Sequence, residues 1–346
     1  MAADSAKLVE SYVFPASVMA TDFPNWLYSL IFAGAALASA GSVRFWTERA
    51  RAWGLLDQPG HRKIHANPIP LAGGLIVTTG LLAPLFFAIV LMNVSLLGDS
   101  LTALSTYGLE QRSLQLGTLI TGAVGLLILG IVDDLKALSA VTKFGIQFLI
   151  ATAVTLTGTR ITLFMPEAIV SYAITILWIL TLVNAFNFTD NMNGLCTGLA
   201  TISAFVFGIH AALPGHYLVA SLGFLIAGAL AGFLPFNFPK ARAFLGDSGS
   251  HLTGYLIAVL GILPHYYHEV GQSKIVVVSP LLIVGGVLAD MVWIVAYRLR
   301  HKRPLYIGDT NHLSHQLVKK GFTEQQSVKM LWLLHALIAV SSFLLL

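Results

Sequence analysis

Charged residues are scarce in this chain of 346 residues, where Asp, Glu, Lys and Arg together make up 10%. A soluble domain carries roughly 25% charged residues, because its surface must contact water. Hydrophobic residues reach 56% of the chain, and the mean hydropathy is +0.78. A soluble fold cannot bury that much apolar surface. The composition therefore excludes a soluble two-domain enzyme, a secreted disulfide scaffold and a disordered tail, and it indicates a membrane protein.

Cysteine is almost absent, since Cys196 is the only one. A single thiol excludes an intramolecular disulfide and any multi-cysteine zinc or iron–sulfur site. Long linkers, low-complexity tracts and convincing internal repeats are also lacking, and residues 1–24 do not resemble a cleavable signal peptide. The sequence therefore predicts one membrane domain over residues 1–346.

Long apolar runs, by contrast, recur along the whole chain. A bilayer core of roughly 30 Å needs about 20 apolar residues per helix. The runs are apolar on all sides and lack the alternation of lipid-facing barrel strands. The sequence therefore predicts an all-α, polytopic integral membrane protein with about ten transmembrane helices. The expected spans lie near residues 25–42, 70–92, 114–132, 141–158, 168–187, 195–213, 217–236, 250–264, 275–297 and 328–346.

Basic residues are distributed unevenly between the two sides of these spans. Of the 20 Lys and Arg residues, the less basic side receives only Lys7, Arg112, Arg160 and Lys274. Basic loops stay in the cytoplasm, so both chain termini are expected outside. This bias also accounts for the sequence pI of about 9.1 without a nucleic-acid partner.

Polar clusters gather on the same cytoplasmic side, whereas the opposite loops have almost none. Carboxylate and carboxamide oxygens suit a hard cation such as Mg²⁺, which keeps water or phosphate oxygens among its ligands. His, Arg and Lys side chains suit a diphosphate. We infer a magnesium–diphosphate site at the membrane surface, which takes one water-soluble nucleotide and one lipid. The clusters are the loop 57–74, Asp133-Asp134, the stretch 184–194, the segment 236–250 and the segment 303–315.

Taken singly, most of these clusters also have a plainer interpretation. Asp133 and Asp134 fit a solvated loop beside a helix N-cap. The asparagines between 184 and 193 fit turns or interhelical contacts, and the basic run at 298–303 is most simply an interfacial anchor. Asp290 is harder to explain in this way, because a carboxylate inside a membrane is costly and is usually buried for a reason.

Four signatures occur in an order that resembles the polyprenyl-phosphate N-acetylhexosamine-1-phosphate transferases, the glycosyltransferase family 4 that includes WecA, TarO and MraY. A His-x-x-His segment at 312–315 resembles the fifth, histidine-containing loop of that family. The motifs together run over residues 44–325, and the loop 57–74 is more similar to the WecA/TarO branch than to MraY. The signatures are this loop, Val-Asp-Asp at 132–134, Asn-x-x-Asn-x-x-Asp from 184, and Asn-Phe-Pro…Phe-Leu-Gly-Asp-Ser-Gly-Ser at 237–250.

By this resemblance, Asp247 is expected to be a magnesium ligand, with Asn187 as a second ligand and Mn²⁺ as an alternative ion. Asp133 and Asp134 would orient the lipid phosphate or act as a base, and Asp190 would support the metal or the nucleotide. The residues expected to bind substrate are Asn184, Asn193, Arg242, His312, His315, Lys63 and His65.

Two stretches depart from the family's pattern. The usual Asp-Gly-Leu-Asp-Gly is Asp-Asn-Met-Asn-Gly at 190–194, so Asn193 replaces the second Asp. The usual His-x-His-His is reduced to His-Leu-Ser-His at 312–315. These departures bear on the recognition of the nucleobase, the sugar and the diphosphate.

The resemblance implies transfer of N-acetylhexosamine 1-phosphate, most simply GlcNAc 1-phosphate, from a UDP-sugar to undecaprenyl phosphate. The products would be undecaprenyl-diphospho-sugar and UMP, in the initiating step of a cell-envelope polysaccharide. The site would face the cytoplasm from a bacterial inner membrane, with monomer and homodimer both open. Two alternatives also stay open: a non-catalytic polyprenyl-lipid carrier, and an ion-coupled transporter with polar midplane residues and broken helices.

Overall fold

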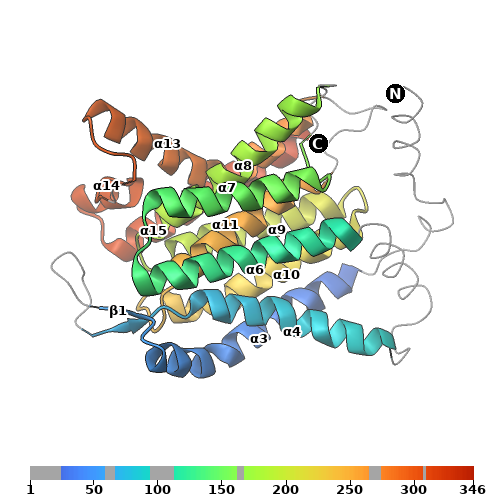
Figure 1. The fold of residues 1–346 in the computed structure, drawn as a ribbon, viewed down its shortest axis with the longest axis horizontal. Helices are drawn as coiled ribbons and strands as arrows, with labels where there is room; N and C mark the ends of the chain where they lie inside the picture. Colours follow the sequence, from blue (N-terminus) through green and yellow to red (C-terminus); the bar gives the residue numbers. More distant parts are fainter. Residues whose placement is uncertain (1–24, 59–66, 94–112, 162–166, 265–273, 307–308) are drawn as a thin grey trace.

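The computed structural model describes residues 25–58, 67–93, 113–161, 167–264, 274–306 and 309–346. Within these ranges the chain is a bundle of helices with one small two-stranded sheet. Most of the long helices run along the long axis of the molecule (Figure 1). The predicted all-α membrane fold is confirmed.

Helices occupy all of the predicted apolar runs. Seven of the described helices are long and apolar enough to cross a membrane, or up to eight if one bent pair counts as a single span. Two others, α7 and α11, have 17 residues each. The count of ten spans therefore stays a prediction. The helices are α3 (Asn25–Ala52), α4 (Gly73–Asn93), α6 (Ser113–Lys136), α7 (Ala140–Leu156), α8 (Ala168–Thr189), α9 (Leu195–Ala212), α10 (Tyr217–Asn237), α11 (Gly246–Ile262), η1 (Lys274–Val278), α12 (Ser279–Ile283), α13 (Gly285–Arg300), α14 (Leu313–Lys319), α15 (Glu324–Ser341) and η2 (Ser342–Leu345).

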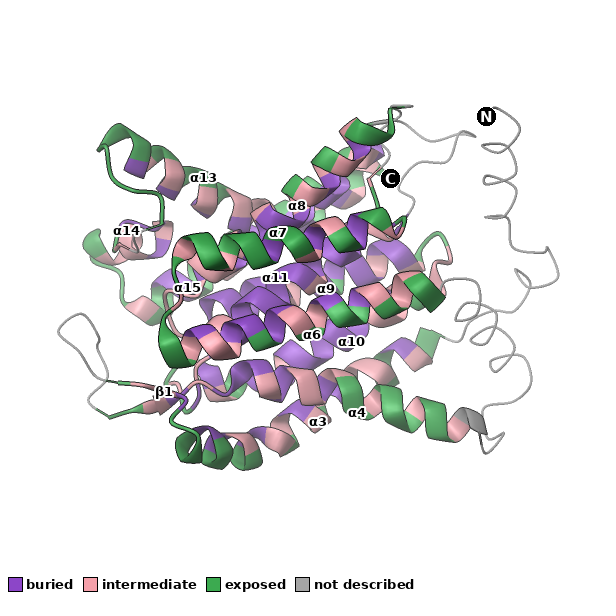
Figure 2. Cartoon of the chain, in the orientation of Figure 1, coloured by how far each residue is buried: buried purple, intermediate pink, exposed green. Residues whose placement is uncertain are grey.

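Helices α9, α10 and α11 form the centre of the bundle, and buried residues dominate them in Figure 2. Helix α10 packs against α9 and α3, while α11 packs against α6, α8 and α4. The outer faces carry exposed apolar side chains, such as Phe86 and Phe87 on α4 at 68% and 67% exposure. Lipid tails are as apolar as these side chains, so a bilayer can cover them. An apolar exterior around an apolar core accounts for the composition.

The expected span at 275–297 is not one straight helix, because its two pieces are bent by 72° at the junction of α12 and α13. A break inside a membrane frees backbone groups that lipid cannot hydrogen-bond. Ser203 Oγ of α9 donates to the carbonyl of Ile283 at 3.1 Å, and Nδ1 of His335 in α15 accepts from the amide of Gly286 at 3.2 Å. Ser203 and His335 also contact each other at 2.9 Å. Two neighbouring helices therefore support the break.

Segments that are far apart in the sequence meet at one end of the bundle, at the left of Figure 1. Strand β1 (Leu56–Asp57) pairs antiparallel with β2 (Ile69–Pro70). The amide of Phe244 donates to the carbonyl of Pro70 at 2.9 Å, and the amide of Gly73 donates to the carbonyl of Phe244 at 2.9 Å. These bonds fasten the start of α4 beside the segment that precedes α11.

Candidate active site

Asp134 of α6 caps the first turn of α11 from across the bundle. Its Oδ1 accepts from the amide of Asp247 at 2.8 Å, and its Oδ2 accepts from the amide of Ser248 at 3.2 Å. The first amides of a helix have no partner within the helix, and an anion there is favoured by the helix dipole. The capping residue lies 113 positions before the turn that it caps. Asp134 therefore fixes the position of Asp247.

Glycines permit this close approach. A Cβ on Gly130 of α6 would lie 2.5 Å from the carbonyl carbon of Asp247, and closer still to the backbone of Ser248. A Cβ on Gly74, at the start of α4, would lie 2.7 Å from Ser248 Oγ. Gly246 itself has a φ of 73°, a conformation that glycine adopts without strain. Helices α4 and α6 therefore both approach the first turn of α11 through glycine.

Asp133 pairs with a lysine that the sequence analysis did not single out. Its Oδ1 accepts from the amide of Leu138 at 2.7 Å, and its Oδ2 lies 2.7 Å from Nζ of Lys143. The same ammonium lies 3.9 Å from Oδ2 of Asp247. Lys143 is thus shared by two carboxylates. The signal was present in the sequence, because Lys143 follows the N-cap Ser139 in a first turn where the helix dipole disfavours a cation.

The two expected metal ligands lie in contact with each other. Nδ2 of Asn187, near the end of α8, donates to Oδ1 of Asp247 at 2.7 Å and to Oγ of Ser250 at 3.0 Å. Burial, and then the neighbouring carboxylates Asp133 and Asp134, raise the pKa of Asp247 to about 7. The carboxyl of Asp247 is therefore short of positive partners.

Asp190 follows α8 directly and adds a fourth carboxyl group. Burial, and then the charges of Asp247 and Asp134, raise its pKa well above the usual range. Among the residues that the structure describes, Lys143 is the one cation that forms ion pairs within this cluster, and its partners are Asp133 and Asp247. The cluster therefore has more carboxyl groups than one lysine balances, and a bound cation would favour their ionised forms.

A complete metal centre built from protein side chains is not found in the described parts of the chain. No three His, Cys, Asp or Glu side chains there could hold an ion together. An ion at Asp247 and Asn187 would therefore take its remaining ligands from water or from a substrate, as magnesium commonly does.

The other expected asparagines join elements of the fold. Nδ2 of Asn184 donates to Oε1 of Gln147 in α7 at 2.7 Å, within the contact between α7 and α8. Nδ2 of Asn193 donates to the carbonyl of Pro239 at 3.2 Å. The structure thus gives Asn184 the interhelical contact that was the plainer interpretation.

The two departures from the family's pattern contact each other. Oγ of Ser314, at the third position of the usual His-x-His-His, donates to Oδ1 of Asn191 at 2.7 Å. Asn191 occupies the place of the first glycine in the usual Asp-Gly-Leu-Asp-Gly. Its Nδ2 donates in turn to the carbonyl of Phe188 at 2.8 Å. Helix α14 is therefore joined to the loop after α8 by residues that the family's pattern lacks.

His312 and His315 lie at the start of α14, with ring centroids 6.4 Å apart. His312 is buried, and its Nδ1 lies 2.7 Å from Oδ2 of Asp290 in α13. Burial, and then the neighbouring His312 and Lys319, lower the pKa of His315. The structure thus brings together the two predicted histidines, and Asp290 belongs to the same group.

Arg298 is not an interfacial anchor, as the sequence analysis expected, but a buried residue with 1% exposure. Its Nε donates to Oδ2 of Asp309 at 3.0 Å, and its Nη1 donates to the carbonyl of Leu305 at 2.6 Å. The guanidinium also lies over the ring of Phe188, 5.3 Å from the centroid. Arg298 therefore holds the segment between α13 and α14 against the end of α8.

Three expected substrate-binding residues are not placed in this group. Arg242 is exposed, and its backbone amide donates to the carbonyl of Phe236 at 2.7 Å. Lys63 and His65 lie outside the described residues. Their expected roles stay predictions.

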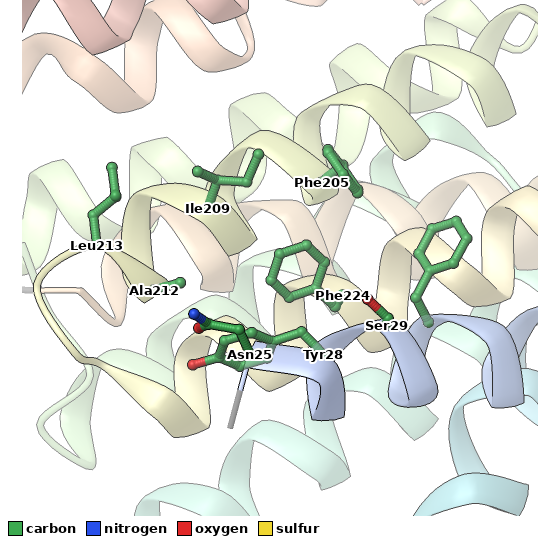
Figure 3. A pocket seen from close by; sticks show the side chains of 9 residues that line it. Asn25, Tyr28, Ser29, Phe205, Ile209, Ala212, Leu213 and Phe224 are labelled. Atoms are coloured by element: carbon green, nitrogen blue, oxygen red, sulfur yellow. The ribbon is translucent and has the colours of Figure 1, made fainter. Parts of the chain in front are cut away.

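A cavity of about 650 Å³ lies between α3, α9 and α10 (Figure 3). Its lining includes the aromatic side chains Tyr28, Phe205 and Phe224. It is formed by the start of α3 and the end of α9, whereas the carboxylates lie beside the start of α9. The cavity carries no acid, base or cation among its lining residues, so it is separate from the candidate active site.

Comparison with known proteins gives one consistent result. The sequence model described as glycosyl transferase family 4 matches residues 116–265, which hold all four clustered carboxyl groups. The probable undecaprenyl-phosphate N-acetylglucosaminyl 1-phosphate transferase of Bacillus subtilis (strain 168) is 30% identical over 300 residues, which cover 84% of this chain and 77% of that protein. The decaprenyl-phosphate N-acetylglucosaminephosphotransferase of Mycobacterium tuberculosis is 30% identical over 327 residues, covering 87% and 77%.

The undecaprenyl-phosphate alpha-N-acetylglucosaminyl 1-phosphate transferase of Salmonella typhi is 28% identical over 302 residues, covering 83% of this chain and 75% of that protein. These similarities extend over most of each chain and include the motif-bearing region. The chain therefore belongs to glycosyl transferase family 4, among its polyprenyl-phosphate N-acetylhexosamine-1-phosphate transferases.

Proposed function

We propose that this protein transfers N-acetylhexosamine 1-phosphate, in the first instance GlcNAc 1-phosphate, from a UDP-sugar to undecaprenyl phosphate, with release of UMP. The observation that carries the proposal is the cluster of Asp133, Asp134, Asp190 and Asp247 around the first turn of α11. The names of the related proteins support the polyprenyl-phosphate acceptor and the N-acetylglucosamine group.

The surplus of carboxyl groups supports a divalent cation, with Mg²⁺ as the proposed ion. Asp247 would hold it, and Asn187 would supply its amide oxygen once its Nδ2 no longer donates to Asp247. When bound, such an ion neutralises charge on the diphosphate and on the phosphoryl group in transfer. Without a cation, burial and the neighbouring carboxylates raise the pKa of Asp247 to about 7. A bound cation would favour the ionised carboxylate and so offset this effect.

The residues of the chain favour direct transfer in one step. A lipid phosphate has a second pKa near roughly 6, so at neutral pH it is already a dianion and needs little help from a base. One of its oxygens would attack the β-phosphorus of the donor, and the bond from that phosphorus to the UMP oxygen would break. UMP then leaves, and the lipid keeps a diphosphate bridge to the sugar.

A two-step route would instead require an aspartate as covalent nucleophile. Both oxygens of Asp134 accept backbone amides, and both oxygens of Asp133 are engaged by Leu138 and Lys143. Such carboxylates position and balance charge, which supports the one-step route. Asp133→Asn is therefore expected to keep part of the activity.

The proposed site faces the cytoplasm of a bacterial inner membrane. The clustered residues lie at the end of the spans where Arg44, Arg49 and Arg51 also lie, and basic loops stay in the cytoplasm. A water-soluble UDP-sugar and a membrane lipid phosphate can both reach such a position. We propose that the product starts a cell-envelope polysaccharide.

The decisive experiment uses purified full-length protein, undecaprenyl phosphate, Mg²⁺ and a panel of UDP-sugars, with UMP and lipid products followed by mass spectrometry. We expect one N-acetylhexosamine donor to give UMP and a lipid-diphospho-sugar in equal amounts, and chelation of the ion to stop both. Asp247→Asn is the matched negative control. Absence of UMP with every donor, while a related transferase works in parallel, would overturn the proposal and favour a non-catalytic lipid carrier.

A further inference from the structure

Asp290 is a buried carboxylate inside α13 that the proposed transfer step does not use. Its side chain is 8% exposed, and it lies within the bent span formed by α12 and α13. A carboxylate in such a position is costly unless its oxygens are satisfied. The nearest arginine of the same helix, Arg298, is paired with Asp309 instead. Some other partner must therefore account for Asp290.

Both oxygens of Asp290 are directed at the start of α14. Oδ1 accepts from the amide of Leu313 at 2.7 Å, and Oδ2 lies 2.7 Å from Nδ1 of His312. The carboxylate thus holds the backbone and the imidazole of adjacent residues at once. The ring of His312 is therefore fixed both in position and in rotation.

This contact also decides which nitrogen of His312 carries a proton. A carboxylate accepts hydrogen bonds only, so Nδ1 must be the donor. In the described residues no hydrogen bond occupies Nε2, on the opposite edge of the ring. When Nε2–H donates to a phosphate oxygen, the ring is an imidazolium, and Asp290 supplies the counter-charge.

We propose that Asp290 is a positioning residue, which holds His312 with Nδ1 protonated and supplies the counter-charge when Nε2–H donates to the diphosphate of the donor. This inference rests on the proposed transfer reaction for the identity of the ligand. The pairing of a carboxylate with the inner nitrogen of a histidine fixes its tautomer and orientation, as it does for histidines at metal and catalytic sites.

Asp290→Asn removes the acceptor for Nδ1 while it keeps an oxygen for the amide of Leu313. The amide group of asparagine then donates to Nδ1, so the proton of the neutral ring moves to Nε2, and no carboxylate is left to balance the charge of a ring protonated on both nitrogens. We expect kcat/KM for the UDP-sugar to fall by about 10- to 100-fold, the usual effect of removing a group that orients a histidine. The KM for undecaprenyl phosphate is expected to stay unchanged.

Two further variants separate positioning from simple support of the loop. Trp293→Phe is the matched control, because Nε1 of Trp293 on the same helix donates to the carbonyl of Asn311 at 2.9 Å, beside His312. It removes one bond between α13 and this loop and is expected to leave kcat/KM unchanged. In a His312→Ala background, Asp290→Asn is expected to cause no further loss.

A measurement that needs no transfer activity completes the test. Protein labelled with ¹⁵N-histidine gives the protonation of each ring nitrogen by NMR, and His312→Gln identifies the signals of His312. We expect a proton on Nδ1 in the wild type and its transfer to Nε2 in Asp290→Asn. Wild-type protein that releases no UMP but has this pattern would overturn the transfer reaction while supporting the role of Asp290.

Three results would overturn the role of Asp290. The first is an unchanged tautomer in Asp290→Asn, and the second is wild-type kcat/KM in that variant. The third is an equal loss in the His312→Ala background, because a residue that acts through His312 has no effect once the imidazole is gone.

Discussion

Replacement of Gly130 by alanine tests how closely α6 must approach α11. The added Cβ would lie 2.5 Å from the carbonyl carbon of Asp247, and closer to the backbone of Ser248. Backbone atoms cannot rotate away as a side chain can, so the two helices must separate by about 1 Å. The hydrogen bond from the amide of Asp247 to Asp134, now 2.8 Å, would lengthen to about 3.8 Å and be lost.

We expect a moderate loss of stability and a large loss of activity. Overpacking of this kind costs about 1–3 kcal/mol of unfolding free energy, and a displacement of about 1 Å at a catalytic group lowers the rate by roughly 100-fold. The measurements are kcat for UMP release and the midpoint of thermal unfolding in one detergent.

Gly117→Ala is the matched control for Gly130→Ala. It adds the same methyl group to the same helix, at a position where nothing lies within 4 Å of the new Cβ. This variant is expected to keep wild-type kcat and to unfold no earlier than the wild type. Equal kcat values for the two alanine variants would refute the argument that the α6–α11 contact sets the position of Asp247.

Substitutions at three further contacts test the other parts of the argument. Lys143→Gln removes the cation shared by Asp133 and Asp247, so we expect kcat to fall by roughly 100-fold. Lys136→Gln, at an exposed position, should keep kcat, and equal values for both would contradict the electrostatic role. Ser314→Ala and Asn191→Ala remove one hydrogen bond between them, so their effects on kcat should couple by about 1 kcal/mol, and simple additivity would argue against the contact. His335→Phe leaves the amide of Gly286 unpaired and should lower the unfolding free energy by about 1–3 kcal/mol, whereas an unchanged thermal midpoint would exclude this.

The fold class could be predicted because it depends on local properties of the sequence. Apolar runs of sufficient length predict helices in a bilayer whatever their neighbours are. The break near Val284 was missed, although Gly285-Gly286 lies directly after it and paired small residues are a known cause of kinks. Its angle could not be read from the sequence, because packing against α9 and α15 determines it.

The site was predicted as a group of residues more readily than as a set of contacts. Adjacent residues of a helix point about 100° apart, so the sequence could place Asp133 and Asp134 together but could not say that one pairs with Lys143 and the other caps α11. Lys143 was counted only as part of the basic bias. Arg298 was misjudged because an arginine at the end of a helix can be an interfacial anchor or a member of a buried ion pair, and the sequence does not distinguish the two. In the structure it pairs with Asp309.

The bend between α12 and α13 places an unusual constraint on how this sequence can drift over evolution. Ser203 and His335 bind main-chain atoms of the junction, but the two glycines that follow α12 are constrained as well, because a Cβ on Gly286 would lie 2.6 Å from Nδ1 of His335 and a Cβ on Gly285 would lie 2.8 Å from Cγ2 of Ile338. The requirement therefore falls both on these glycines and on the polar side chains that α9 and α15 supply, although the helices α9 and α15 are themselves unbroken. The imprint of this discontinuous helix on related sequences is therefore expected in its two glycines and in its neighbours α9 and α15 together.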